Sequence, residues 1–215
     1  MKIFIPIKHN SQRVPRKNFR ELNGVPLYKH TLYKLKDYSL YVDTDSDEIM
    51  DGINSDSELK NVNCYRRREN LIGDEVSVCD LISNFIDRYI FKDEHVCQIH
   101  VTSPFLTLLT LEAAYDRIKE GYDSVASCNE IHTRFWRKEE YGYSPINHNP
   151  MKLEQTQDLP TYYEENSNFY IFSSENFKKT KTRIGFNPYF YTTEFPENMD
   201  IDTEDDWKLA EIIGK

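Results

Sequence analysis

Short apolar segments alternate with amphipathic helical segments over the first 130 or so residues of this 215-residue chain. Segments of this length suit strands, and the stretches between them repeat apolar residues at helical spacing. The expected strands are Ile3–Ile7, Ser39–Val42, Val62–Tyr65, His95–Val101 and Asp123–Ser127. The expected helices lie at about 27–35, at 76–89, from a cap at Thr107 or Thr110 to about 120, and after a cap at Asp45 or Ser46. This pattern is typical of a mostly parallel sheet with helices on both faces. We therefore expect a Rossmann-like, three-layer α/β/α fold.

The alternation is lost between Ile131 and Asn166, where aromatic residues, prolines and asparagines dominate. We expect a long insertion there, with a β-hairpin arm that closes over a substrate or reaches a second subunit. Strands are expected again at Asn168–Phe172 and Tyr189–Tyr191. No internal repeat or low-complexity linker divides the sequence, so residues 1–215 are expected to form one domain.

The composition disfavours several classes of protein. A net charge of −9 argues against general nucleic-acid binding, which would require a basic face. No apolar run approaches the roughly 18 residues that span a bilayer, and no cleavable apolar segment precedes the first strand, so neither membrane insertion nor secretion is expected. The cysteines contain no C-x-x-C pair, and we expect reduced thiols in a cytoplasmic protein. They are Cys64, Cys79, Cys97 and Cys128.

The first strand leads into a loop that concentrates positive charge in an acidic protein. Residues 8–20 contain no carboxylate and no glycine, and their cations are Lys8, Arg13, Arg16, Lys17 and Arg20. Ligands of open α/β sheets bind beyond the carboxyl ends of strands, so the loop is a candidate anion site. The lack of glycine disfavours the G-x-x-x-x-G-K-[ST] and G-x-G-x-x-G loops, and with them kinases, ATPases and simple NAD enzymes. A solvated basic turn is the alternative.

Asp200 and Asp202, near the end of the chain, form a second candidate site. In an extended segment the two side chains would share a face, and two carboxylates could hold a Mg²⁺ ion that also contacts phosphate oxygens. Thr203 and Asp206 match a helix capping box and are expected to be structural. Capping does not account for Asp200 and Asp202. A D-x-D pair on its own is nevertheless a weak signal.

Several segments, taken together and in order, resemble the acylneuraminate cytidylyltransferase family, the CMP–sialic acid synthetases and their relatives. Each segment is weak alone, whereas their shared order and spacing make the resemblance specific. The segments are Ile5-Pro6-x-x-x-Asn10-Ser11-x-x-x-Pro15-x-Lys17-Asn18, Asn23-Gly24-x-Pro26-Leu27, Asp43-Thr44-Asp45, Arg67-x-Glu69-x-Leu71-x-x-Asp74, Thr102-Ser103-Pro104, Asp123-Ser124-Val125, Tyr170-Ile171-Phe172 and Asp200-Ile201-Asp202-Thr203-Glu204-Asp205-Asp206.

The resemblance implies a nucleotidyltransferase fold, usually dimeric, and transfer of CMP from CTP to the anomeric hydroxyl of a sugar acid with release of pyrophosphate. By resemblance, Lys17, Asp200 and Asp202 are the expected catalytic residues, and the two aspartates would carry Mg²⁺. The nucleotide-binding residues implied for the triphosphate, ribose and cytosine are Lys8, Ser11, Arg13, Lys17, Asn18, Arg67 and Ser77. The acceptor-binding residues implied are His100, Thr102, Ser103 and Asn166.

The sequence also departs from the family pattern. Lys8, Gln12, His100 and Leu106 stand where the family usually has arginine, lysine, glutamine and arginine. The run Glu154–Gln157 lacks the arginine that commonly precedes Asp158-Leu159-Pro160, and Asn166-Ser167-Asn168 replaces the usual N-G-A. The acceptor half departs further than the nucleotide half. Three alternatives therefore remain open: a cytidylyltransferase with a non-sialic acceptor, a catalytically degenerate nucleotide-binding protein, and, with a poorer fit, a glycosyltransferase.

Overall fold

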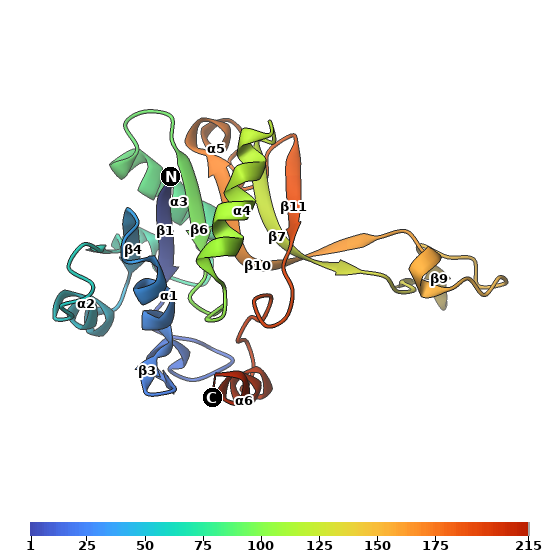
Figure 1. The fold of residues 1–215 in the computed structure, drawn as a ribbon, viewed down its shortest axis with the longest axis horizontal. Coiled ribbons are helices and arrows are strands. Elements are labelled where there is room, and N and C mark those ends of the chain that lie inside the picture. Colours follow the sequence, from blue (N-terminus) through green and yellow to red (C-terminus); the bar gives the residue numbers. More distant parts are fainter. Residues whose placement is uncertain (215) are drawn as a thin grey trace.

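A seven-stranded sheet forms the centre of the computed structural model, which describes residues 1–214 (Figure 1). Its strands are β1 (Lys2–Ile7), β4 (Leu40–Thr44), β5 (Asn63–Arg66), β6 (His95–Ile99), β7 (Ser124–Ile131), β10 (Tyr162–Ser173) and β11 (Pro188–Thr192). They lie in the order β11-β7-β10-β6-β1-β4-β5. Within the described residues, β10 alone runs antiparallel to its neighbours in this sheet. The predicted mostly parallel sheet is confirmed.

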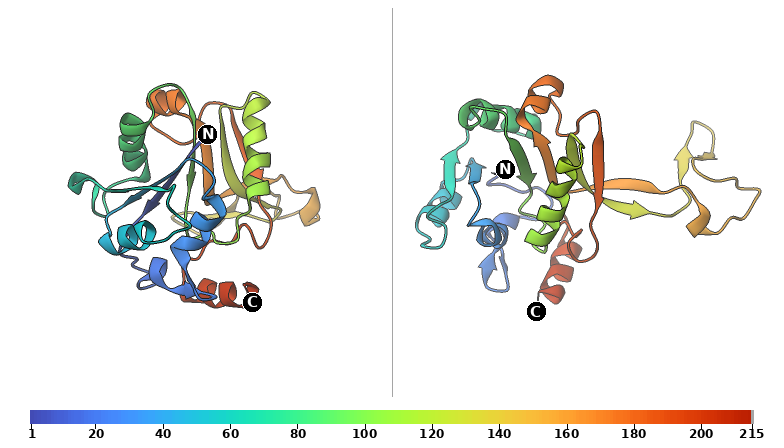
Figure 2. Two further views of the ribbon diagram at one scale, coloured as in Figure 1. Left: turned by 60° about the vertical axis from the view of Figure 1, so that its left-hand side comes forward. Right: turned by 45° about the horizontal axis from the view of Figure 1, so that its top comes forward.

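Helices cover both faces of the sheet (Figure 2). They are α1 (Leu27–Leu35), α2 (Asp47–Asn54), α3 (Val78–Tyr89), α4 (Leu108–Lys119), α5 (Ser174–Thr180) and α6 (Glu204–Ile213). Helices α1, α2 and α4 pack with Ile3 and Ile5, whereas α3 and α5 pack on the opposite face with Phe4. Strand β1 is therefore buried on both faces, which explains its continuous apolar run. Across residues 1–214, none of the helices is both long and apolar enough to cross a membrane.

The helix starts follow the expected capping residues. Ser46 caps α2 and Thr107 caps α4, each hydroxyl accepting a hydrogen bond from the backbone N–H three residues ahead. Thr203 and Asp206 form the complete capping box of α6, in which the Asp206 carboxylate accepts from the Thr203 N–H at 2.7 Å. The structural role predicted for Thr203 and Asp206 is therefore confirmed.

The strand order places a topological switch point beside β1. Strands β4 and β5 follow on one side of β1 and β6 lies on the other, so the connections after β1 and β6 diverge and leave a crevice at their carboxyl ends. The segment after β1 forms a 3-10 turn, η1 (Lys17–Phe19), and a small ribbon of β2 (Glu21–Leu22) and β3 (Val25–Pro26). Another 3-10 turn, η2 (Glu69–Leu71), follows β5.

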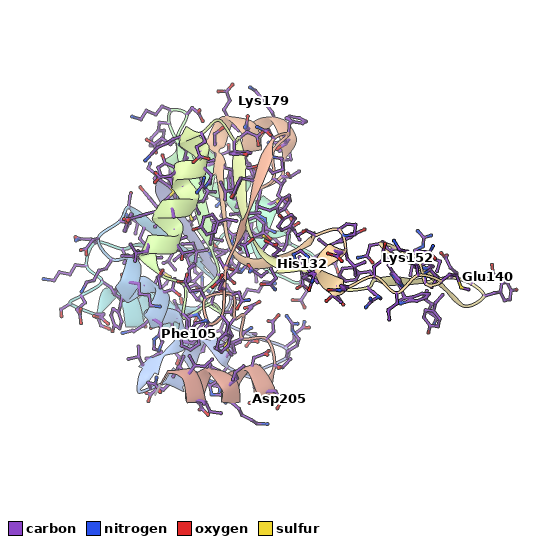
Figure 3. All side chains as sticks on the ribbon, turned by 45° about the vertical axis from the view of Figure 1, so that its right-hand side comes forward. Phe105, His132, Glu140, Lys152, Lys179 and Asp205 are labelled. Carbon is purple, nitrogen blue, oxygen red and sulfur yellow. The ribbon has the colours of Figure 1, made fainter. Side chains whose placement is uncertain are left out.

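Strands β7 and β10 continue past the sheet as a long arm, with Glu140 near its tip (Figure 3). The arm contains β8 (Trp136–Lys138), β9 (Tyr143–Pro145) and the 3-10 turn η3 (Thr156–Asp158). The predicted start of the strand at Asn168 was wrong. Strand β10 begins at Tyr162, because residues 162–165 pair with β7 before an irregularity between Glu165 and Tyr170 shifts the register.

Candidate functional site

A cavity of about 590 Å³ lies at the carboxyl ends of β1 and β6, in the crevice at the switch point. The cationic loop after β1 forms much of its wall. The predicted site residues that line it are Lys8, Ser11, Arg13, Lys17, Asn18, Arg67, His100 and Thr102, and further lining residues include Asn10, Gln12, Asp74, Val76, Val78 and Leu81. The fold thus brings eight of the residues singled out in the sequence to one hollow.

The loop and the D-x-D segment meet through Lys17. The Lys17 ammonium donates to the Ile201 carbonyl at 2.6 Å and to Asp202 Oδ1 at 3.0 Å, while Arg13 lies 2.7 Å from Asp202 Oδ2. The side chain of Lys17 is only 10% exposed and that of Asp202 is 32% exposed. Partial burial strengthens this pairing relative to an ion pair at the surface. The two candidate sites inferred separately from the sequence therefore form one site.

Asp200 lies in a less satisfied environment than Asp202. Burial raises the pKa of the Asp200 carboxyl, and the charge of Asp202 adds to the rise, although a hydrogen bond from Thr102 opposes it. Asp200 Oδ1 is buried and has no hydrogen-bond partner within the described chain. Leaving a buried acceptor unpaired costs roughly 1–3 kcal/mol, and a cation at this oxygen would remove the penalty.

A hard divalent cation fits these carboxylates, because Mg²⁺ prefers oxygen ligands and often combines one or two carboxylates with substrate phosphates. Among residues 1–214, no group of three or more histidine, cysteine, aspartate or glutamate side chains could hold a metal ion by itself. Asp200 and Asp202 would consequently need oxygens from a bound ligand to complete the coordination.

Two loop side chains are engaged by Asp74 on the opposite wall. Gln12 Nε2 donates to Asp74 Oδ2 at 3.0 Å, and Lys8 Nζ lies 3.7 Å from Asp74 Oδ1. Both side chains are exposed enough to move toward an incoming anion. Asn18 is more fixed, because its amide donates to the Lys8 carbonyl at 2.8 Å. Its Oδ1 is buried without a partner in the described residues, which leaves an acceptor available for a ligand.

Arg67 supports the cavity wall from beneath. Its side chain is 1% exposed and forms an ion pair with Asp43, which is fully buried. One guanidinium nitrogen also donates to the Ile7 carbonyl at 3.3 Å and to the Asp43 carbonyl at 3.1 Å. Burial raises the pKa of Asp43, and the Arg67 charge opposes that rise. Much of the guanidinium is therefore used to join the ends of β1 and β4.

His100 lines the cavity at the end of β6. Burial lowers the pKa of His100 to about 4, and the positive charges of Arg183 and Lys17 contribute to the decrease. The imidazole is consequently neutral at physiological pH. It can donate one hydrogen bond and accept another, as a glutamine side chain does.

Five predicted site residues of the described chain lie outside the lining of this cavity: Ser77, Ser103, Asn166, Asp200 and Asp202. The Ser77 hydroxyl donates to Asp80 at 2.7 Å within the capping box of α3. Ser103 donates to Asn168 Oδ1 at 2.9 Å, and Asn166 donates to Thr193 at 2.7 Å beside the sheet. Their assignments as ligand-binding residues stay predictions.

Sequence reasoning did not assign roles to Asp43 or Asp74. Both belong to the segments that carry the family resemblance, which was the available signal. Their partners lie 24 or more positions away in the sequence, so the pairings depend on the fold.

A family model for cytidylyltransferases matches residues 3–213. N-acylneuraminate cytidylyltransferase A of Danio rerio is 30% identical over 210 residues, which cover 94% of this chain and 47% of the relative. CMP-N,N'-diacetyllegionaminic acid synthase of Legionella pneumophila is 30% identical over 97% of this chain and 94% of its own. Pseudaminic acid cytidylyltransferase of Campylobacter jejuni is 24% identical over 98% of this chain.

A solved structure of CMP:2-keto-3-deoxy-manno-octonic acid synthetase complexed with CTP has the same fold. Its TM-score is 0.68 at 13% identity, covering 99% of this chain and 97% of that one. The chain spans about half the length of the first curated relatives it matches. The family match over residues 3–213 confirms the resemblance drawn from the sequence. This chain belongs to the cytidylyltransferase family.

Proposed function

We propose that the protein transfers CMP from CTP to a sugar acid and releases pyrophosphate. The observation that carries this proposal is that the glycine-free cationic loop lining the cavity contacts the D-x-D segment, through Lys17 and Asp202. Relatives named as synthases or cytidylyltransferases of acylneuraminic, legionaminic and pseudaminic acids support a nonulosonate acceptor.

The reaction would be an in-line attack of the acceptor's anomeric hydroxyl on the α-phosphorus of CTP. A bond forms between that oxygen and phosphorus, the α–β phosphoanhydride bond breaks, pyrophosphate leaves, and the hydroxyl proton passes to solvent or a nearby base. Catalysis of such a step consists largely of positioning and charge neutralisation. Lys8, Ser11, Arg13 and Lys17 surround the space in which the triphosphate would bind.

The ribose and cytosine would occupy the part of the cavity near Asn18 and Arg67. The unpaired Asn18 Oδ1 is an acceptor suited to a ribose hydroxyl or the cytosine amino group. Ser77 is the third residue that the family resemblance implies here. Its hydroxyl would have to exchange its bond to Asp80 for one to the nucleotide.

Asp200 and Asp202 are the residues that would hold Mg²⁺. When bound, the ion would supply positive charge to the phosphate oxygens and so favour attack at phosphorus. The unpaired Asp200 Oδ1 supports this assignment. Arg13 and Lys17 pair with the two carboxylate oxygens of Asp202, so the ion would have to displace one of these cations. Arg13 is the more exposed of the two and would turn toward the triphosphate as the ion binds.

We further propose that the enzyme acts as a cytoplasmic homodimer, with His100, Thr102, Ser103 and Asn166 on the acceptor side. The arm is the element that would reach a partner, because it projects from the body (Figure 1) and because it exposes large apolar side chains. These include Tyr141, Tyr143, Met151 and Leu153. The cysteines, all free, suit a reducing compartment.

Pyrophosphate release tests the proposed function. The purified protein is incubated with CTP, Mg²⁺ and each of the following: N-acetylneuraminic, N,N'-diacetyllegionaminic, pseudaminic and 2-keto-3-deoxy-manno-octonic acid. We expect release that requires both CTP and one of these acids, with ATP unable to replace CTP. Tight CTP binding without turnover of any acid would instead indicate a catalytically degenerate nucleotide-binding protein.

A further inference from the structure

A polar cluster lies beside the nucleotide cavity, on the face of the sheet that α3 and α5 cover. Gln98 on β6 and Tyr170 on β10 are directly opposite each other in the sheet, and both are buried. Arg183, from the connection between α5 and β11, joins them. Its Nη1 donates to Gln98 Oε1 at 2.7 Å, and its Cζ lies 3.7 Å from the centroid of the Tyr170 ring. The guanidinium is thus held in one orientation by stacking and by a hydrogen bond.

This cluster has donors without acceptors. No carboxylate lies within the 4.0 Å ion-pair distance of Arg183 in residues 1–214, although several other arginines of the described chain have such partners. The carboxylate of Glu165 accepts a hydrogen bond from the Tyr170 hydroxyl at 2.7 Å. Gln98 is fully buried, and its Nε2 has no partner within the described residues. Gln98 Nε2 is thus a buried donor without an acceptor, and beside the partly exposed guanidinium of Arg183 it indicates a place for an anionic or acceptor-rich group.

The cluster adjoins the cavity through His100. Gln98 lies within β6, and His100 follows the last residue of that strand, Ile99, so the two are only two positions apart in the chain. His100 lines the cavity. The influence of both Arg183 and Lys17 on the pKa of His100 agrees with a position between the two cations. A ligand that extends from the triphosphate loop past His100 would therefore approach the guanidinium.

We infer that Arg183 binds the carboxylate of the sugar-acid acceptor and selects acidic sugars over neutral ones. This inference rests on the proposed function. The run Glu154–Gln157 contains no cation. Arg183 contacts Gln98, which is two positions from the cavity-lining His100, and has no carboxylate partner among the described residues. A planar guanidinium matches a carboxylate through two parallel hydrogen bonds, which a lysine cannot reproduce. Tyr170 would fix the guanidinium plane, and neutral His100 would contact the sugar hydroxyls.

The test compares each sugar acid named above with its methyl ester, which lacks the negative charge. Binding is measured by calorimetry in the presence of CMP, which cannot donate a nucleotidyl group. The wild-type protein is expected to bind at least one acid about 10- to 100-fold more tightly than its ester. R183Q should bind acid and ester about equally, and R183K should retain an intermediate preference. CTP affinity should change less than about 2-fold in both variants, because Arg183 lies outside the triphosphate loop.

R134Q is the matched control, because Arg134 is an arginine of the arm whose guanidinium contacts the Glu154 carbonyl. It should leave the preference for the acid unchanged. A lesion in packing would weaken acid and ester alike, so loss of the preference alone identifies a contact with the carboxylate.

The two proposals fail in different ways. The role of Arg183 is overturned if the preference for the acid over its ester persists in R183Q or is lost only in R134Q. In either case, turnover by the wild-type protein would still support the proposed function. Acid binding through Arg183 without pyrophosphate release overturns the proposed function and leaves the inference intact. Absence of both binding and turnover for all of these acids overturns both.

Discussion

Replacing Asp200 by asparagine is expected to stabilise the metal-free protein even though it removes a residue proposed for catalysis. Asp200 Oδ1 is buried without a partner, and the carboxylate lies close enough to Asp202 for their charges to repel. An asparagine amide would still place a polar atom at that position but would carry no charge there. Desolvating an unpaired buried group costs roughly 1–3 kcal/mol, and more when the group is charged, so we expect removal of the charge to contribute a gain of about that size. For a domain of this size each kcal/mol shifts Tm by about 2–4 °C, so the expected increase is about 2–12 °C.

Asp202→Asn is the matched comparison and should have the opposite effect on stability. It removes the carboxylate that pairs with Lys17 and Arg13. Because Asp202 is about one-third exposed, we expect a moderate loss of about 1–2 kcal/mol and a decrease in Tm of about 2–8 °C. Both substitutions should reduce the rate of pyrophosphate release by about 100-fold or more, since each removes an oxygen proposed to contact the metal.

The pH dependence provides an independent check. The pKa of Asp200 is raised in the folded state, so the ionised group destabilises the fold at neutral pH. That destabilisation disappears as the pH falls through the raised pKa, because the folded protein then binds the proton. Thermal melts in EDTA should therefore show a Tm advantage of D200N that is largest at neutral pH and shrinks in acid. A decrease in Tm for D200N, or a difference independent of pH, would refute the reasoning.

Further predictions concern residues around the cavity and the arm. Asp43→Ala should destabilise the fold by about 3–5 kcal/mol in urea titrations, because it leaves the Arg67 guanidinium buried without its carboxylate partner; a loss below about 1 kcal/mol would contradict this. Ser167→Gly should stabilise the protein by about 0.5–1 kcal/mol in thermal melts, because Ser167 has a φ of 62°, and any decrease in Tm would count against it. Asp74→Asn should tighten CTP binding by about 2- to 5-fold at low salt in calorimetry, because it frees Lys8, and an unchanged affinity would show that the contact does not compete with phosphate.

Much of the central sheet could be predicted because its strands are apolar and its helices are amphipathic. Helix α1 begins and ends where the spacing of residues 27–35 indicates, and Thr107 caps α4 as expected. The early start of β10 could not be predicted in this way. Residues 162–165 are exposed polar and aromatic side chains on the arm, where neither face is fully buried and no apolar alternation marks a strand.

Two parts of the candidate site could be predicted from the sequence. The cationic loop stands out because it concentrates positive charge in an acidic protein, and Asp200 and Asp202 stand out because helix capping does not explain them. The contacts within the site were not predictable. Asp43 reaches Arg67 because β4 and β5 are neighbours, and Gln98 reaches Arg183 across 85 positions because the connection between α5 and β11 passes over β10 and β6. The chemistry of such residues is visible in a sequence, whereas their partners depend on strand order.

The contact between Lys17 and Asp202 also has a consequence for the order of folding. It joins residues 185 positions apart, so the site requires that the intervening residues have folded. During synthesis, the loop emerges well before its carboxylate partner. Contacts of such high sequence separation form late, after the intervening sheet has closed the distance. The proposed binding of CTP would therefore require that residues as far as Asp202 have folded, and a nascent or truncated chain that ends before Asp200 would hold the basic loop without its carboxylate partner.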